Sequence, residues 1–168
     1  SDAASYNTAH GYQALYNTTT GEKNTAIGYH SMYSNTTGEY NAAIGTDSLR
    51  ANTTGEQNVA LGHNSLYNNT SGFGQVAGGF RSLFENTTGN YNTGMGAYCL
   101  ENNTTGSFNV AVGFEALQDN LTNFNVAVGY QAGKKINSGA YNIAVGYQSL
   151  FSNTTGQTNV GIGYQALY

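Results

Sequence analysis

Several residue types are scarce or missing in this 168-residue chain. It has no proline, no tryptophan and a single cysteine, Cys99, and only 8% of its residues are charged. One cysteine excludes an internal disulfide, and 14 tyrosines with little charge are not typical of a disordered chain. No apolar run approaches the ~18 residues of a transmembrane helix, so we expect no membrane insertion.

The charge balance and the missing motifs narrow the function further. The formal net charge is -4, whereas proteins that bind nucleic acid present a basic surface to the phosphates, so we expect no nucleic-acid partner. No phosphate-binding loop, zinc-ligand spacing or Ser-His-Asp arrangement is present. We therefore expect no metal site, no cofactor and no catalytic activity.

What the chain does contain is a repeat of seventeen residues with the phrase N-x-A-x-G-Y-x-x-L-x-x-N-T-T-G-x-x. One interval, from Asn109 to Asn125, is sixteen residues long. A short, regular period indicates one small unit stacked on copies of itself, so residues 1–168 are predicted to form a single repeat domain. The coils begin at Asn7, Asn24, Asn41, Asn58, Gln75, Asn92, Asn109, Asn125, Asn142 and Asn159.

Positions within the repeat are numbered from this first residue. Positions 2 to 5 alternate branched and small residues, which predicts a short strand with 2 and 4 on one side. Glycine at position 5 of all ten copies predicts a positive φ or the close approach of another backbone. Positions 6 to 9 predict a second short strand, with 4 and 9 pointing inward. Asn-Thr-Thr-Gly at 12 to 15 predicts a tight turn with a left-handed glycine.

These patterns together predict an all-β fold, a β-solenoid or parallel β-roll of about ten 17-residue coils ~4.8 Å apart. Like residues then stack on like, and the position-1 asparagines form a structural ladder of amide hydrogen bonds. Three buried side chains per coil contribute on the order of 5–8 kcal/mol, whereas ordering the backbone costs about 1–2 kcal/mol per residue. The small residues at positions 3, 5 and 8 would admit another chain, so we expect a homotrimer.

Three of the coils resemble a known family. The segments 109–113 (NVAVG), 125–129 (NVAVG) and 142–146 (NIAVG) are similar to the head repeats of trimeric autotransporter adhesins. The longer phrase, with its Asn-Thr-Thr-Gly, also resembles repeats of bacterial and phage tail-fibre-like proteins. The resemblance covers about residues 6–168, although the period here is longer than in the adhesin heads. It implies a parallel β-roll that trimerises at a cell surface or on a virion.

The predicted function is therefore that of a non-catalytic fibre or adhesin segment outside the cell, with a surface glycan or protein as its target. Because the chain begins and ends within a repeat, we expect it to be a fragment of a longer fibre. Two alternatives stay open. The paired threonines suggest a monomeric β-solenoid that binds ice or carbohydrate. A fibre-borne glycan hydrolase would need two neighbouring carboxylates, and Glu115 and Asp119 are the closest acidic pair in sequence.

Aromatic residues recur at positions 6, 10 and 17 of the repeat. Those at 6 and 17 are predicted to stabilise a sheet face or an interface. Position 10 also accepts charged residues, which indicates contact with water, and exposed aromatic rings beside polar groups can bind a glycan weakly. The candidate glycan-binding residues are Tyr16, Tyr33, Arg50, Tyr67, Phe84 and Lys134.

The irregular coils are the other candidate region. The seventh coil lacks its turn glycine, and the eighth carries Gly133, Lys134 and Lys135. Such breaks either host a binding loop or reflect drift in a tolerant fibre, and we favour drift. Cys99 lies where other coils have serine or alanine, which predicts a small packed residue. Glu22, Glu39 and Glu56 share position 16, where a solvated edge is favoured over a cation site.

Overall fold

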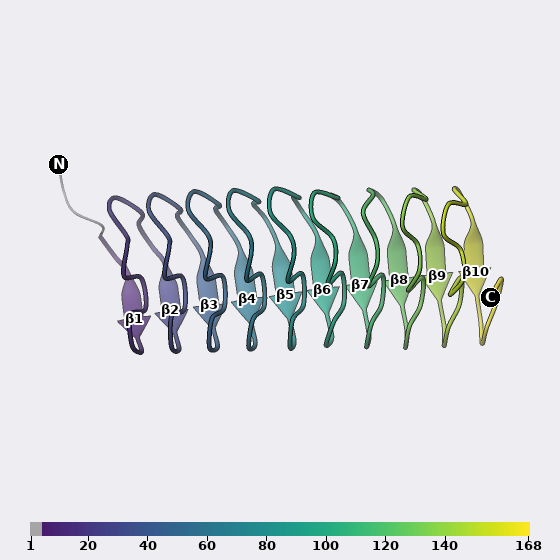
Figure 1. The fold of residues 1–168 in the computed structure, drawn as a ribbon, viewed down its shortest axis with the longest axis horizontal. Helices are drawn as coiled ribbons and strands as arrows, with labels where there is room; N and C mark the ends of the chain where they lie inside the picture. The colour runs from purple at the N-terminus through teal and green to yellow at the C-terminus, as the bar shows by residue number, and fades with distance from the viewer. Residues whose placement is uncertain (1–4) are drawn as a thin grey trace.

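The computed structural model describes residues 5–168 and is a β-solenoid with a single parallel sheet of ten strands in chain order (Figure 1). Each strand has three residues, at positions 2 to 4 of its coil, and successive coils lie side by side along a rod. The predicted all-β solenoid of 17-residue coils is confirmed. The strands are β1 (Thr8–His10), β2 (Thr25–Ile27), β3 (Ala42–Ile44), β4 (Val59–Leu61), β5 (Val76–Gly78), β6 (Thr93–Met95), β7 (Val110–Val112), β8 (Val126–Val128), β9 (Ile143–Val145) and β10 (Val160–Ile162).

The strands pair in strict register, each residue lying beside its equivalent in the next coil. Ala43 of β3 is paired with Ala60 of β4, for example. The ladder continues beyond the strands, since the Gly45 N–H donates to the Ile27 carbonyl at 2.8 Å and the Asp47 N–H to the Tyr29 carbonyl at 2.8 Å. Backbone hydrogen bonds between neighbouring coils therefore surround most of the cross-section and define its shape.

The interior of the coils between the two ends of the rod is filled from positions 3, 8 and 9. In the fourth coil these are Ala60, Ser65 and Leu66, all fully buried. The predicted inward direction of position 4 is wrong, because Leu61 is 42% exposed. The coil is so narrow that only small residues fit at 3 and 8 beside the leucine at 9, and the larger strand residues turn outward. The small residues at 3 and 8 thus serve the chain's own core and cannot be the contact between chains that we expected.

Glycine at position 5 meets both requirements that the sequence suggested. Its φ is positive in every coil, for example 130° at Gly113. A Cβ placed on Gly113 would lie 2.5 Å from the carbonyl oxygen of Gly129, the equivalent residue of the next coil. Real Cβ atoms do not approach backbone so closely, so stacking at the usual strand spacing requires glycine here.

The predicted second strand at positions 6 to 9 is wrong, since this segment is a series of turns. Positions 7 and 9 adopt left-handed conformations, with φ of 50° at Gln148 and 52° at Leu150. Their N–H groups bond to opposite neighbours, Gln148 to the Tyr130 carbonyl of the preceding coil and Leu150 to the Ala166 carbonyl of the following coil, both at 2.9 Å or less. The alternation of left-handed residues turns the chain back on itself within a few residues.

The glycine at position 15 is required for a reason that differs from the predicted one. It is not left-handed; the left-handed residue of this turn is at position 17, such as Tyr141 with φ 60°. A Cβ on Gly55 would instead lie 2.3 Å from Oδ1 of Asn52 in its own turn. The same Cβ would lie 2.5 Å from the Gly72 carbonyl oxygen of the next coil, so a buried amide and a neighbouring backbone together occupy the space of the missing side chain.

Two ladders of buried asparagines, at positions 1 and 12, run through the rod and meet at this glycine. Asn58 Nδ2 and Asn69 Nδ2 both donate to the Gly72 carbonyl, at 2.9 and 3.0 Å. Along the ladders, the Asn58 N–H donates to Asn41 Oδ1 at 2.9 Å, and Asn69 Nδ2 donates to Asn52 Oδ1 at 2.9 Å. The predicted position-1 ladder is present, and position 12 adds a second one in the interior, where each amide satisfies its neighbours.

The eighth coil keeps the interior volume while exchanging the two residues that fill it. Gly133 replaces the leucine of position 9, and Ile136 replaces the asparagine of position 12. A Cβ on Gly133 would lie 3.0 Å from Ile136 Cδ1, which shows that the isoleucine fills the space that leucine occupies elsewhere. Because this coil has no second amide, Asn125 Nδ2 donates to the Oδ1 of Asn120 in the preceding coil at 2.9 Å.

Candidate functional site

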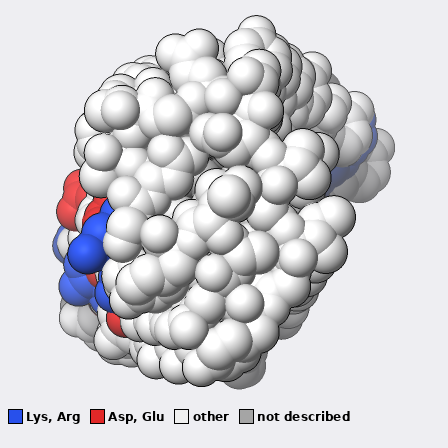
Figure 2. All heavy atoms as spheres, turned by 90° about the vertical axis from the view of Figure 1, so that its right-hand side faces the viewer, with Lys and Arg blue, Asp and Glu red and all other residues white. Residues whose placement is uncertain are grey.

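Positions 7 and 10 form the variable face, one side of the rod where the residue type changes from coil to coil. This face holds ionisable side chains of both signs, and Figure 2, a view along the rod, shows most of the visible Lys, Arg, Asp and Glu atoms gathered on one side, with a smaller blue patch on the other. The turns at positions 6 to 10 present these side chains in two adjacent rows, so a side chain of one coil reaches those of the coils on either side. The charged residues of the face are Asp47, Arg50, Arg81, Glu101, Glu115 and Lys134.

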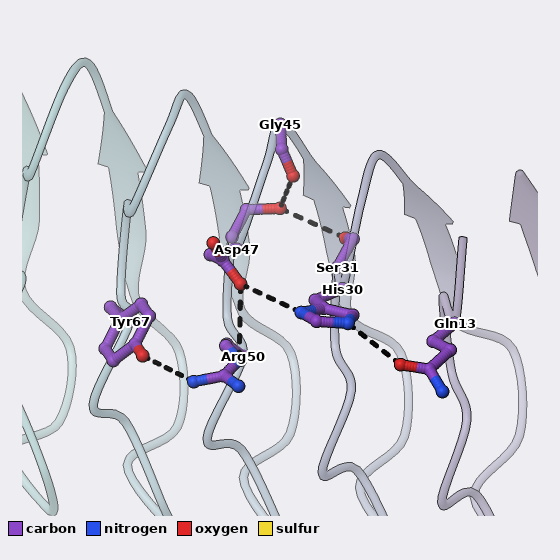
Figure 3. A network of polar contacts seen from close by, with 8 residues as sticks. Gln13, His30, Ser31, Gly45, Asp47, Arg50 and Tyr67 are labelled. Carbon is purple, nitrogen blue, oxygen red and sulfur yellow. Dashed lines mark hydrogen bonds and ion pairs between the residues drawn. The ribbon is translucent and has the colours of Figure 1, made fainter. Parts of the chain in front are cut away.

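A polar network spans the first four coils of this face (Figure 3). His30 Nε2 lies 2.8 Å from Gln13 Oε1, and His30 Nδ1 lies 3.6 Å from Asp47 Oδ1. Arg50 Nε lies 3.2 Å from the same Asp47 oxygen, and Arg50 Nη1 donates to Tyr67 Oη at 2.5 Å. Asp47 and Arg50 lie in the same coil, whereas every other contact of the network joins residues of two neighbouring coils. The network therefore connects four coils.

A second set of ionic contacts connects the fifth to the seventh coil. Glu101 is only 8% exposed, and its carboxylate is paired with Arg81 Nε at 2.7 Å and accepts from Gln118 Nε2 at 2.6 Å. Arg81 also stacks its guanidinium over the Phe84 ring, 4.0 Å from the ring centre. A carboxylate this well covered is stable only when it is paired and hydrogen-bonded, and both conditions are met.

Glu115 repeats this arrangement one coil further along. Lys134 Nζ and Gln131 Nε2 each donate to Glu115 Oε2 at 2.6 Å. Burial by itself raises the pKa of this carboxyl, but the hydrogen bonds from Lys134 and Gln131 outweigh it, and the pKa lies below its ordinary value. Glu115 is therefore held as a carboxylate, which suits an ion pair better than a proton donor.

The six predicted glycan-binding residues all lie on this face, at position 10, but most of their binding groups face one another. Tyr16 and Tyr33 stack with ring centres 5.4 Å apart, and the Arg50 guanidinium lies 5.7 Å from the Tyr33 ring centre and 5.5 Å from that of Tyr67. Tyr16 at the end of the row is exposed, whereas the others are half-buried. In the stacked stretches the ring faces lie against neighbouring side chains, so glycan binding by this row remains a prediction that would have to use ring edges and the exposed Tyr16.

The opposite character is found on the sheet face, the outward side chains of positions 2 and 4 with the aromatic rows at 6 and 17 beside them. Val112 and Val128 are each 38% exposed at position 4 of neighbouring strands. Outward alternation places aliphatic side chains on one flat surface along the rod. The sequence analysis missed this face because it placed position 4 in the interior. The signal that could have located it is the constant small size of positions 3 and 8, which indicates a core too narrow for the larger residues of position 4.

The aromatic rows that border the sheet face are stacked and exposed. At position 6, the Tyr130 and Tyr147 rings lie 5.1 Å apart and are nearly parallel. At position 17, Phe108 and Phe124 lie 5.2 Å apart with an interplanar angle of 4°. Stacked rings stabilise neighbouring coils and at the same time leave a broad apolar border open to solvent.

Charge is almost absent from the sheet face. Lys23, at position 17, is the exception, and its Nζ donates to Tyr40 Oη at 2.8 Å and lies 3.9 Å from Glu22. The hydrogen bond to Tyr40 is the main cause that raises the pKa of Lys23 above its ordinary value. Lys23 thus places a positive charge beside Glu22, the first residue of the predicted acidic row at position 16.

A notch of about 520 Å³ opens on the turn side of the rod, across the sixth to ninth coils. Its residues come from positions 11, 13 and 14, and they include Asp119, Leu121 and Lys135. From the sequence we predicted that the irregularity of these coils reflects sequence drift in a tolerant fibre and not a binding loop. The signal that could have located the notch is the sixteen-residue interval, because a coil that is one residue short must recede between two complete ones.

The remaining reactive residues support no further site. No group of three or more His, Cys, Asp and Glu able to hold a metal occurs among residues 5–168. Cys99 is buried, as predicted, with its Sγ 3.0 Å from Ser82 Oγ, and burial raises the pKa of its thiol to about 11. Such a thiol stays protonated at neutral pH and acts as a small core residue.

No protein-family model, curated protein or solved structure matches this chain. In the part of the chain that the structure covers, no helix is long and apolar enough to cross a membrane.

Proposed function

We propose that this chain is a non-catalytic segment of an extracellular or virion-borne fibre that provides length and presents surfaces for attachment. The observation that carries the proposal is the unbroken parallel sheet, in which each coil repeats the backbone bonds of the last. A stack of this kind gains length with each repeat and offers the same exposed faces throughout. The resemblance to adhesin heads and tail-fibre-like repeats points the same way.

We also propose that the fibre is a homotrimer whose chains meet through the sheet face. Ten strands at the usual spacing and four outward rows give a face of roughly 900 Å². Stable contacts bury about 800 Å² per partner, which is the order of the whole face that each chain of a trimer would share between its two neighbours, and contact centres are poor in charge and rich in aromatics. The sheet face has both properties, and the resemblance to a trimerising family favours three copies over two.

The test of this proposal is the mass of the protein in solution by light scattering. A chain of 17.7 kDa gives a trimer of 3 × 17.7 = 53.1 kDa. Val112→Lys combined with Val128→Lys places two charges at the centre of the sheet face and should give monomers. Thr37→Lys combined with Thr54→Lys adds the same charge to exposed turn residues and should leave the trimer intact.

Each outcome decides between defined alternatives. A wild-type monomer would contradict the proposed trimer and favour a solenoid that acts as a single chain. A dimer would be compatible with contact through the sheet face but would contradict a trimeric, adhesin-like assembly. If the turn variant also dissociates, the contact does not involve the sheet face.

Attachment is proposed to be weak and multivalent, since three chains with repeated sites gain avidity without one strong pocket. The position-10 row is the proposed glycan contact, with Tyr16 as its most accessible ring. The proposal contains no catalytic step, because the covered carboxylates Glu101 and Glu115 are held by Arg81 and Lys134.

The ice-binding alternative is less well supported by the turn threonines. In the first five coils the threonine at position 13 uses its hydroxyl within the chain; Thr53 Oγ1, for example, donates to the Thr70 carbonyl at 3.1 Å. A hydroxyl bonded in this way is not free to order water. We expect no thermal hysteresis in a solution of the protein, and a clear hysteresis would restore the alternative.

A further inference from the structure

The notch across the sixth to ninth coils is produced by one missing residue. The seventh coil lacks position 14, and Thr122 lies where other coils have the turn glycine. Thr122 takes over the local bonds, since its carbonyl accepts from Asn109 Nδ2 at 2.7 Å and its hydroxyl donates to the Gly139 carbonyl at 2.6 Å. The shorter turn thus keeps its bond to Asn109 in its own coil and its bond to the turn of the eighth coil, so the depression is a built feature of the rod.

The short turn also changes the residue at its surface. Leu121 stands at position 13, where most coils have threonine, and it is 41% exposed. Its N–H still donates to the Asn137 carbonyl at 3.1 Å, so the backbone follows the ordinary course while an aliphatic side chain faces the notch. A leucine replaces a hydroxyl at the one turn that is recessed.

Polar groups surround the Leu121 side chain in the notch. Asp119 Oδ1 accepts from Asn102 Nδ2 at 2.8 Å, which fixes the carboxylate at the rim. Lys135 lies over the Phe151 ring, 4.8 Å from its centre, and no ion pair between residues 5 and 168 joins it to Asp119. Amide and hydroxyl groups complete the lining, including those of Asn137 and Thr154.

We propose that this notch binds a neutral saccharide of one or two rings. Its volume of about 520 Å³ lies within the range of small-molecule sites. One acidic and one basic side chain leave the lining without net charge, which disfavours anionic and cationic ligands. The many amide and hydroxyl groups match a ligand rich in hydroxyls, and Leu121 provides an apolar contact for the C–H face of a ring.

This site is separate from the position-10 row and from the sheet face, so it goes beyond the proposed fibre function. Its residues lie at positions 11, 13 and 14, on the turns. The sixteen-residue interval that forms the notch occurs once among the ten coils, whereas the other exposed features recur in many coils. An open site of this size is expected to bind in the millimolar range, and a trimer would present three copies.

The experiment is saturation-transfer NMR with maltose, lactose and cellobiose as separate probes, together with the shifts of the Leu121 methyl signals. We expect saturable binding of at least one disaccharide that moves these signals. The decisive variant combines Leu121→Thr with a glycine inserted after Thr122, which restores the regular Asn-Thr-Thr-Gly turn and removes the notch. It should weaken binding at least tenfold without loss of folding, because it recreates the turn of the other coils.

Two further proteins complete the test. Thr70→Leu exposes a leucine on a full-length turn and should bind no sugar beyond the wild-type level, whereas Asp119→Asn should weaken binding while keeping the notch. No saturable binding of any of the three disaccharides, equal binding by the restored-turn variant, or a preference for glycine as a zwitterionic probe would overturn the proposal. The solution mass should be the same in all variants, so the result is independent of the trimer.

Discussion

The interior of the coils and the variable face use the same repeat in opposite ways. Inside, alanine, leucine and the two asparagines recur in coil after coil, and each stacks on its own kind. On the variable face, most residues at positions 7 and 10 differ between neighbouring coils, apart from Tyr16 and Tyr33 and the run Gln131, Gln148 and Gln165. Unlike partners meet at several places, as in the pairs Arg81–Glu101 and Lys134–Glu115. The interior therefore stabilises the stack but would accept any coil on any other. The variable face supplies the contacts that distinguish the correct neighbour from a coil displaced by one repeat.

The largest expected effect is a loss of stability, caused by a substitution at the tightest backbone contact between two coils. Gly113→Ala places a Cβ about 2.5 Å from the Gly129 carbonyl oxygen and should lower the free energy of unfolding by about 3–5 kcal/mol. Gly163→Ala is the matched control, because Gly163 has a similar φ of 125° but no atom within 4 Å of the added Cβ. It should cost only the backbone strain, about 1–3 kcal/mol. Equal losses in urea unfolding would show that the contact between coils contributes nothing.

A second change asks whether the interior depends on residue identity or on filled volume. Leu49→Gly and Asn52→Ile each disturb the third coil, and each should cost about 2–4 kcal/mol. Together they reproduce the pair Gly133 and Ile136 of the eighth coil, so the double variant should be more stable than the sum of the single effects by at least about 1 kcal/mol. Strict additivity in thermal unfolding would mean that the exchange in the eighth coil is unrelated to packing.

On the variable face the effect should be smaller and dependent on pH. Glu115→Gln removes one ion pair and should cost about 0.5–1 kcal/mol near neutral pH. Because the folded-state pKa of Glu115 is lowered, its contribution is present above the unfolded-state pKa and is lost as the pH falls through the folded-state pKa. The difference between wild type and variant should thus disappear in acid. Glu56→Gln, at an exposed turn, should show no such difference, and a gap that persists in acid would contradict the assignment.

The smallest expected effect is a gain in stability, and it comes from a substitution at an exposed residue of the rod. Gln57 is exposed and left-handed, with φ 57°, and the equivalent residue of the next coil is Gly74, with φ 65°. Gln57→Gly removes the strain of a side chain in this conformation, which exceeds the entropy that glycine adds to the unfolded chain, so stability should rise by about 0.5 kcal/mol. A fall in the melting temperature would show that the Gln57 side chain makes a contact worth more than this strain.

Much of the fold followed from the period alone. The seventeen-residue coils, a short strand predicted at positions 2 to 5 and found at 2 to 4, and the close approach at position 5 were all predictable, because regular repetition leaves stacking as the only way to bury residues. Position 9 points inward as predicted, but the direction of the position-4 side chains was not predicted correctly. We assigned Leu61 to the interior by its hydrophobicity, but the width of the coil decides, and Ala60 fits where Leu61 does not.

The asparagines show a second limit of the sequence. Asn52 and Asn69 are fully buried, yet composition alone places asparagine on surfaces and in turns. Each bonds to the glycine of its own turn and to the asparagines of the coils on both sides, and only the stacked structure brings these last two partners together. The notch at Leu121 likewise arises from a deletion whose effect is visible only beside two complete coils. In each case the missing information was the contact between coils, which no single repeat contains.

The pairing of each coil with only its two neighbours also bears on how the chain folds. Parallel sheets usually form slowly, since their strands are joined by long crossovers and distant parts of the chain must meet. Here a strand pairs with one that follows about seventeen residues later, which gives a relative contact order of about 0.1, in the range of helical bundles. Once two coils have paired, the third has a template, so the rod should assemble by propagation and do so at nearly the same rate per coil however many repeats follow.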